Sequence, residues 1–129
     1  MTISATEQFA RDLNFAWYEG RYDDLEKYYH PEVVMSVPGC LKPVVGWAAM
    51  LETYREFADV VQVHAFSINQ LEVFAYDGVE LCHLDFEVDY ETSDGRFQEQ
   101  GRDVYVIKEN SRGQKQVVWR TQQRIDYSD

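Results

Sequence analysis

The chain has 129 residues, with 12 Lys and Arg against 23 Asp and Glu and a formal net charge of −11. A surface of this sign repels phosphate backbones and anionic lipid headgroups, so nucleic acid and membranes are not expected as partners. With 45% hydrophobic and 15% aromatic residues, the sequence is too apolar for a disordered chain, and its length predicts one domain over residues 1–129.

The sequence has neither a recognisable targeting segment nor a cysteine motif. No apolar run approaches the ~20 residues that span a bilayer, and the start Met1-Thr2-Ile3-Ser4 lacks the basic and then apolar pattern of a signal peptide. We therefore expect a cytoplasmic protein. Cys40 and Cys82 are the two cysteines of the sequence and form no CxxC motif, so neither a disulfide scaffold nor a metal site is predicted, and no cofactor is expected.

The first third of the chain has helical spacing. Ser4 and Glu7 fit a capping box before a first helix that Gly20 ends, with apolar residues on one face at Phe9, Leu13, Ala16 and Trp17. Residues 22–30 predict a shorter amphipathic piece stopped by Pro31. Residues 33–37 predict a short strand closed by Pro38-Gly39, and a third helix starts at Trp47, with apolar positions Met50, Leu51, Tyr54, Phe57 and Ala58.

From residue 62 onward the apolar period changes to two. Four long strands are predicted, at roughly 62–76, 79–91, 97–109 and 115–126, and the turn sequences between them are Asp77-Gly78, Ser93-Asp94-Gly95 and Asn110-Ser111-Arg112-Gly113. Three helices followed by an antiparallel meander predict an α+β fold, with the helices on one face of a bent sheet.

The order of these elements resembles the nuclear-transport-factor-2-like, or SnoaL-like, superfamily. The resemblance runs from about Phe9 to Asp126 and is carried by the sequence pattern of residues 19–25 and 30–33, between the first helix and the first strand. It implies a cone-shaped, curved antiparallel sheet with three N-terminal helices packed on its concave face, the cystatin-like α+β barrel. It also implies a mostly apolar pocket at the open end, in a superfamily that includes isomerases, dehydratases and non-catalytic binding modules.

Strand parity leaves two assignments of the second long strand open. The apolar set Cys82, Leu84, Phe86, Val88 and Tyr90 faces the helices in one assignment, and the set Leu81, His83, Asp85 and Glu87 faces them in the other. The resemblance to ketosteroid isomerases and scytalone dehydratases favours the second, because His83 falls where those enzymes have pocket-lining residues. Since neither sheet face is purely polar, a homodimer through the sheet is expected.

The candidate catalytic residues come from the same resemblance. His64 is similar to the second catalytic histidine of the dehydratases, Tyr18 and Glu19 to a tyrosine and an aspartate at the same helix end, and Asp103 to a protonated aspartate of the isomerases. Histidines near a carboxylate suit proton transfer at neutral pH. We assign His83 and His64 as acid and base, Asp85 or Asp103 as orienting group or donor, and Tyr18 as the ligand of a carbonyl or water.

Further residues are candidate contacts of a small-molecule ligand. They are Trp17, Glu19, Trp47, Tyr54, Tyr105, Trp119, Thr121 and Gln123. The leading hypothesis is a cofactor-independent dehydratase or isomerase acting on a small apolar carbonyl or hydroxy-carbonyl compound. The alternatives are a non-catalytic ligand-binding or assembly module and the small subunit of an oxygenase, both of which the resemblance also allows.

Overall fold

The computed structural model describes residues 3–37 and 41–124. Its helices are α1 (Ala5–Tyr18), α2 (Tyr22–Leu25), the 3-10 helix η1 (Glu26–Tyr28) and α3 (Trp47–Val60). Its strands are β1 (Tyr29–Ser36), β2 (Val44–Val45), β3 (Gln62–Tyr76), β4 (Val79–Thr92), β5 (Gly95–Glu109) and β6 (Lys115–Arg124). The predicted turn at Pro38-Gly39, Cys40 and the predicted strand end at 125–126 lie outside the described residues.

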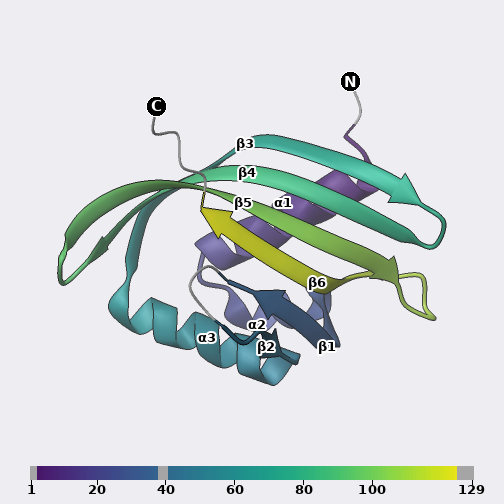
Figure 1. The fold of residues 1–129 in the computed structure, drawn as a ribbon, viewed down its shortest axis with the longest axis horizontal. Coiled ribbons are helices and arrows are strands. Elements are labelled where there is room, and N and C mark those ends of the chain that lie inside the picture. Colours follow the sequence, from purple (N-terminus) through teal and green to yellow (C-terminus); the bar gives the residue numbers. More distant parts are fainter. Residues whose placement is uncertain (1–2, 38–40, 125–129) are drawn as a thin grey trace.

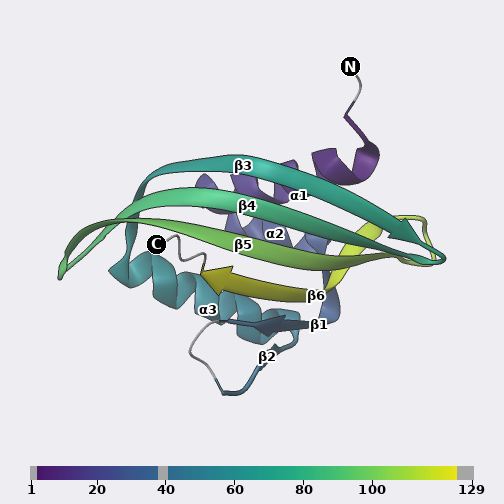
Figure 2. The same ribbon diagram turned by 45° about the horizontal axis from the view of Figure 1, so that its top comes forward.

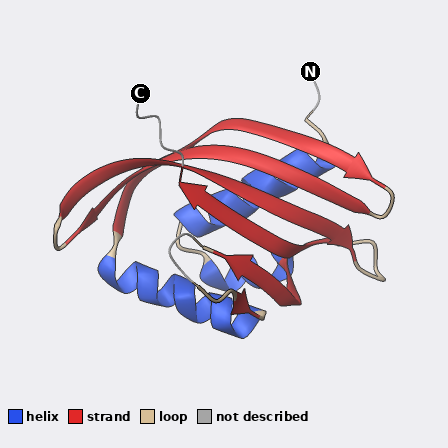
Figure 3. Cartoon of the chain, viewed as in Figure 1, coloured by secondary structure: helices blue, strands red, loops and turns tan. Residues whose placement is uncertain are grey.

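The six strands form one sheet in the order β2-β1-β6-β5-β4-β3. Neighbouring strands are antiparallel except for β1 and β6, which are parallel. The sheet arches over α1, and α3 lies on the same side beside β1 and β2 (Figure 1). Turning the molecule shows the helices on one side of the curved sheet (Figure 2), and Figure 3 separates the helical layer from the strand layer by colour. The predicted α+β architecture is confirmed.

Helix α1 begins as its capping sequence predicts. The Ser4 hydroxyl accepts a hydrogen bond of 3.1 Å from the backbone N–H of Glu7, which satisfies one of the N–H groups left over at a helix start. The helix is tied to β4 at the same end, where Thr6 Oγ1 donates to the Glu80 carboxylate at 2.7 Å. Among the described helices, none is both long and apolar enough to cross a membrane.

The segment predicted as one amphipathic piece at 22–30 is shorter than expected. Helix α2 ends at Leu25, η1 follows, and β1 already begins at Tyr29. The residue before a proline avoids the α conformation and favours an extended one, so Pro31 extends the backbone instead of only stopping a helix. Tyr29 is thereby a strand residue whose side chain is 1% exposed.

Strand β4 turns its apolar set toward the helices. Cys82, Leu84, Phe86 and Val88 are buried in the core, whereas His83 is half-buried on the other face. The first of the two parity assignments is therefore correct. Burial raises the pKa of the Cys82 thiol to about 12, so this cysteine is held as a neutral apolar group.

The concave face is shaped by a close contact between β4 and β5. Phe86 lies opposite Gly101, and a Cβ at that glycine would be 2.8 Å from Cε2 of the Phe86 ring. The ring therefore occupies the space that a side chain at Gly101 would take, and it covers the β5 backbone there.

Candidate functional site

A cavity of about 490 Å³ lies between the concave face of the sheet and helices α1 and α3. Its walls are apolar and largely aromatic: Trp17, Met35, Val37, Phe57, Val61, Phe66, Phe86, Val88 and Tyr90. Four polar lining residues are buried, namely Asn14, Tyr54, Asp103 and Arg120. The other polar residues of the lining are Thr53, Glu99, Gln100, Gln122 and Gln123. Pockets of about 300–1,000 Å³ with apolar walls and a few polar groups typically hold small organic ligands.

The buried part of the cavity is built on an ion pair between β5 and β6. Arg120 Nη2 lies 3.0 Å from Asp103 Oδ2, and the two side chains are 9% and 2% exposed. The second contact, from Arg120 Nε to Asp103 Oδ1, is 3.4 Å long. A charged pair at this depth needs further hydrogen bonds to be tolerated, and the neighbouring tyrosines supply them.

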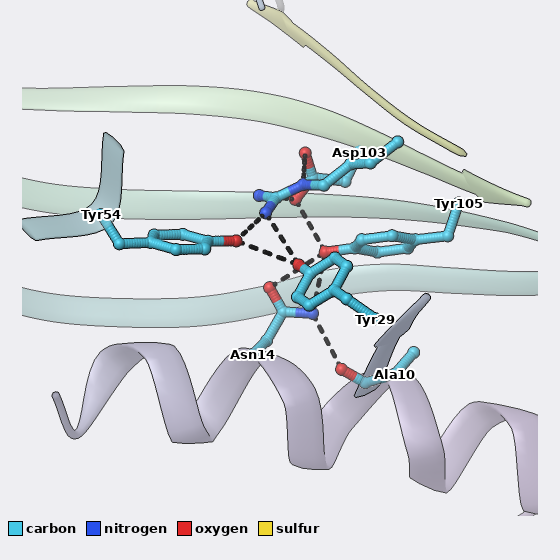
Figure 4. A network of polar contacts seen from close by, with 7 residues as sticks. Ala10, Asn14, Tyr29, Tyr54, Asp103 and Tyr105 are labelled. Carbon is cyan, nitrogen blue, oxygen red and sulfur yellow. Dashed lines mark hydrogen bonds and ion pairs between the residues drawn. The ribbon is translucent and has the colours of Figure 1, made fainter. Parts of the chain in front are cut away.

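Two tyrosine hydroxyls accept from the other end of the guanidinium. Arg120 Nη1 donates to Tyr54 of α3 at 2.6 Å and to Tyr29 of β1 at 3.1 Å. The two hydroxyl oxygens lie 3.0 Å apart. Figure 4 shows the hydroxyls of Tyr29, Tyr54 and Tyr105 turned toward one another. Arg120 therefore joins three elements that are distant in the sequence.

Helix α1 completes the network behind the carboxylate. Tyr105 donates its hydroxyl hydrogen to Asp103 Oδ2 at 3.0 Å, and Asn14 Nδ2 donates to the Tyr105 hydroxyl at 3.2 Å and to the carbonyl of Ala10 at 2.8 Å. Asp103 acts as an acceptor in every one of these contacts. The expectation that Asp103 is a protonated donor therefore does not match its surroundings, which are those of a carboxylate.

Burial sets the protonation of the tyrosines around the ion pair. It raises the pKa of Tyr29 and of Tyr105 well above the ordinary value, against the opposing charge of Arg120. Burial alone would lower the pKa of Arg120, but the Asp103 carboxylate and the tyrosine oxygens outweigh it and raise that pKa well above the ordinary value. The guanidinium is thus charged and these hydroxyls keep their hydrogens.

The structure does not bring the predicted histidines together at this cavity. His83 lies on the outer face of the sheet, level with Glu72 of β3 and Val104 of β5. Asp85 lies on the same face, where Arg102 binds it at 2.7 Å and holds its pKa below the usual range by hydrogen bonding. The proposed acid and orienting group therefore face away from the helices, because the apolar set of β4 forms the core.

His64 is displaced by a bulge. The register of β3 and β4 shifts between Val63 and Ala65, so His64 has no partner residue in the ladder and its ring reaches Glu91, with Nε2 2.8 Å from Oε1. Tyr18 lies near by, with its hydroxyl 3.4 Å from the His64 backbone carbonyl. Neither side chain belongs to the cavity lining.

The predicted ligand contacts divide into three groups. Trp17, Tyr54 and Gln123 line the cavity. Tyr105 is buried behind Asp103, and Trp47 stacks on Tyr29 with ring centroids 5.4 Å apart. Outside the lining, Glu19 pairs with Arg21 at 2.7 Å, and the Trp119 indole N–H donates to Thr121 Oγ1 at 2.8 Å on the outer face of β6.

Arg120 was missed because β6 contains a bulge. An unbroken ladder from Lys115 opposite Glu109 would pair Tyr105 with Trp119 and turn Arg120 outward. The observed register shifts after Val117, so that Tyr105 pairs with Arg120 instead. Nothing in the alternation of residues 115–124 marks this shift. The one available signal is chemical, since a buried aspartate needs a cation.

Comparisons with known proteins place the fold. No protein-family model matches the sequence, and no curated protein matches it.

Among the described residues, no group of three or more His, Cys, Asp or Glu side chains is placed to hold a metal ion.

Solved structures match nearly the whole chain. A ketosteroid isomerase-like protein from Erwinia carotovora atroseptica has a TM-score of 0.80 and 15% identity, over 93% of each chain. An NTF2-like protein from Cytophaga hutchinsonii has a TM-score of 0.78 and 13% identity, over 95% of this chain and 100% of that one. The CaMKII hub of S. rosetta has a TM-score of 0.80 and 11% identity, over 97% and 100%. The chain therefore has the nuclear-transport-factor-2-like fold that the order of its elements predicts.

Proposed function

We propose that the chain binds a small, largely apolar organic molecule in the cavity beneath the sheet. The observation that carries this proposal is the combination of an aromatic-walled space of about 490 Å³ with the buried Arg120, Asp103 and Tyr54 at one end. Apolar walls favour a ligand by the hydrophobic effect, and a few fixed polar groups orient it.

Binding can be tested with acetylnaphthalene as a probe. Trp17 lines the cavity, whereas Trp119 lies on the outer face and is 42% exposed. The expected result is a shift of the Trp17 indole N–H signal in an NMR titration, with the Trp119 signal unmoved. Equal shifts of both signals, or none, would contradict the proposal.

A matched pair of variants separates the cavity from the surface. Val61 lines the cavity, and its neighbour Val60 is 67% exposed and does not. Val61→Phe fills part of the space and is expected to weaken probe binding roughly tenfold or more through overpacking. Val60→Phe adds the same ring to the surface and should leave the calorimetric affinity unchanged.

A catalytic version of the same function is a cofactor-independent isomerase or dehydratase. The fold is shared with a ketosteroid isomerase-like protein, and the specific observation in its favour is a second carboxylate, Glu99, in the lining that also contains Arg120. Hydrogen-bond donors and a carboxylate are the groups that enolisation of a carbonyl compound needs. In this version Glu99 replaces the two histidines as the proposed base.

The test is deuterium exchange into the methyl group of acetylnaphthalene in heavy water. Glu99→Gln is expected to abolish exchange above the buffer rate. Glu87→Gln, on the neighbouring strand but outside the lining, is the matched control and should exchange like the wild type. Exchange that survives in Glu99→Gln would rule out Glu99 as the base, and a wild-type protein that exchanges no faster than buffer would leave binding as the function.

We also propose that two copies pair through the outer face of the sheet. The strand register aligns one apolar residue from each of the six strands in a single row: Val45, Val34, Trp119, Val106, Leu81 and Phe74. Phe74 and Trp119 are 44% and 42% exposed. A continuous apolar row across the outer face favours a second copy as its cover.

Val106 lies near the middle of this row and is half-buried. Val106→Glu is expected to convert a dimer to a monomer in analytical ultracentrifugation, because the charge would be buried on pairing. Val60→Glu places the same charge on α3 and should leave the dimer intact. If the wild-type chain sediments as a monomer, the dimer proposal is wrong, and the proposal of a ligand-binding cavity is unaffected.

A further inference from the structure

The hydroxyls of Tyr29 and Tyr54 carry one hydrogen more than their mutual contact can use. Both oxygens accept from Arg120 Nη1, at 3.1 and 2.6 Å, and they lie 3.0 Å from each other. Each tyrosine has one hydroxyl hydrogen, and the bond between the two oxygens uses one of the two. The remaining hydrogen has no acceptor among the described residues.

Burial decides which tyrosine keeps that hydrogen. Tyr29 is 1% exposed and lies outside the cavity lining, whereas Tyr54 belongs to the lining. A buried donor without an acceptor is costly, and a donor that faces a cavity can bind water or a ligand. Either hydroxyl could be the donor of their mutual hydrogen bond, and this difference favours the arrangement in which Tyr29 donates to Tyr54 and Tyr54 directs its own hydrogen into the cavity.

Arg120 has a second donor in the same place. A guanidinium has five N–H groups; two of those of Arg120 bind Asp103 and two bind the tyrosines. The fifth, on Nη2, has no acceptor among the described residues. Since Tyr54 and Arg120 both line the cavity, this N–H is a second candidate donor for a ligand bound there.

The charges of the lining disfavour an anion at these donors. The positive charge of Arg120 is balanced by Asp103 at 3.0 Å. A carboxylate ligand would lose its hydration without gaining an uncompensated cation. A neutral carbonyl oxygen accepts two hydrogen bonds without that cost.

We propose that Tyr54, assisted by Arg120, is the specificity-determining donor for the carbonyl oxygen of an uncharged aromatic ketone or aldehyde. This inference rests on the proposed ligand-binding function and names its ligand class. The Tyr54 ring is fixed for the task, because it stacks on Tyr22 with centroids 5.9 Å apart and an interplanar angle of 14°. A fixed donor loses little freedom when the ligand binds.

Three probes of similar size separate the groups involved. Acetylnaphthalene has a neutral carbonyl, ethylnaphthalene has no acceptor, and naphthoate has a negative charge. The wild-type protein is expected to bind the ketone roughly tenfold more tightly than the hydrocarbon, as one hydrogen bond allows, and to bind naphthoate most weakly. Tighter binding of naphthoate than of the ketone would overturn the inference.

The variants Tyr54→Phe and Tyr29→Phe form a matched pair, since each removes one hydroxyl from the same cluster. Tyr54→Phe is expected to lose the roughly tenfold preference for the ketone while its affinity for ethylnaphthalene stays unchanged. Tyr29→Phe keeps the donor and should keep the preference. An undiminished ketone preference in Tyr54→Phe overturns the inference and leaves the binding function standing.

An infrared measurement on the wild-type protein needs no variant. The carbonyl stretch of bound acetylnaphthalene should lie at lower frequency than in hexane, because two donors polarise the bond. An unshifted stretch overturns the inference even if a variant fails to fold. Failure of all three probes to bind would instead overturn the proposed function itself.

Discussion

Replacing Asp103 with Asn tests whether the ion pair with Arg120 stabilises the buried part of the cavity. The substitution keeps the shape of the side chain but leaves Arg120 charged at 9% exposure, without a counter-ion. One charge-assisted hydrogen bond of 3.0 Å is worth about 1.5–3 kcal/mol, and the second, at 3.4 Å, is weaker. Together with the uncompensated buried charge, the expected loss is about 3–5 kcal/mol of unfolding free energy.

Urea unfolding followed by circular dichroism measures this loss. Domains of this kind are usually stable by about 5–15 kcal/mol, so the variant should have a clearly lower midpoint. The double variant Asp103→Leu with Arg120→Met removes both charges and should be more stable than Asp103→Asn, since an apolar pair often replaces a buried ion pair at little cost. A loss below about 1 kcal/mol in Asp103→Asn, or a double variant less stable than the single one, would refute the reasoning.

Three further outcomes are expected. Gly101→Ala should cost about 1–3 kcal/mol in the same urea assay and weaken probe binding, because its Cβ would overlap the Phe86 ring; unchanged stability would show that the ring moves freely. Asp85→Asn should lower the free energy of unfolding by about 1 kcal/mol at neutral pH. Arg102 lowers the pKa of Asp85 in the folded state, so the stabilisation is fully present when the pH is above the pKa of Asp85 in the unfolded chain. It should vanish as the pH falls through the lower pKa of the folded state. Ser4→Ala should cost about 1 kcal/mol by removing the α1 cap, and Ser4→Thr is its control.

Local patterns were sufficient for most of the helices and strands, whereas their arrangement in space was expected from the family resemblance. The turn at Asp77-Gly78 and the apolar period of two predicted β3 and β4 almost to the residue, and Ser4 marked the start of α1. These features depend on neighbours in the sequence, where sterics and hydrogen bonding act over a few residues. The early start of β1 at Tyr29 was missed because Pro31 signals an extended backbone as well as a helix end.

The site could be predicted only in part, because side-chain direction depends on ladder register. Asp103 and Tyr54 were expected at the pocket and line it, as do Trp17 and Gln123. Bulges in β3 and β6 displaced His64 and turned Trp119 outward and Arg120 inward. A single extra residue reverses the face of everything beyond it, and a sequence pattern without pairing information does not show where that residue sits.

The Arg120 guanidinium in the buried part of the cavity also determines how late in folding the cavity can form. Arg120 is 91 residues from Tyr29 and 66 from Tyr54 along the chain, so its contacts close two of the largest loops in the topology. Contacts of such long sequence separation lose much chain entropy and are slow to form. During synthesis the helices and the first hairpin emerge before β6, so the cavity can be completed only after Arg120 and the rest of β6 have left the ribosome.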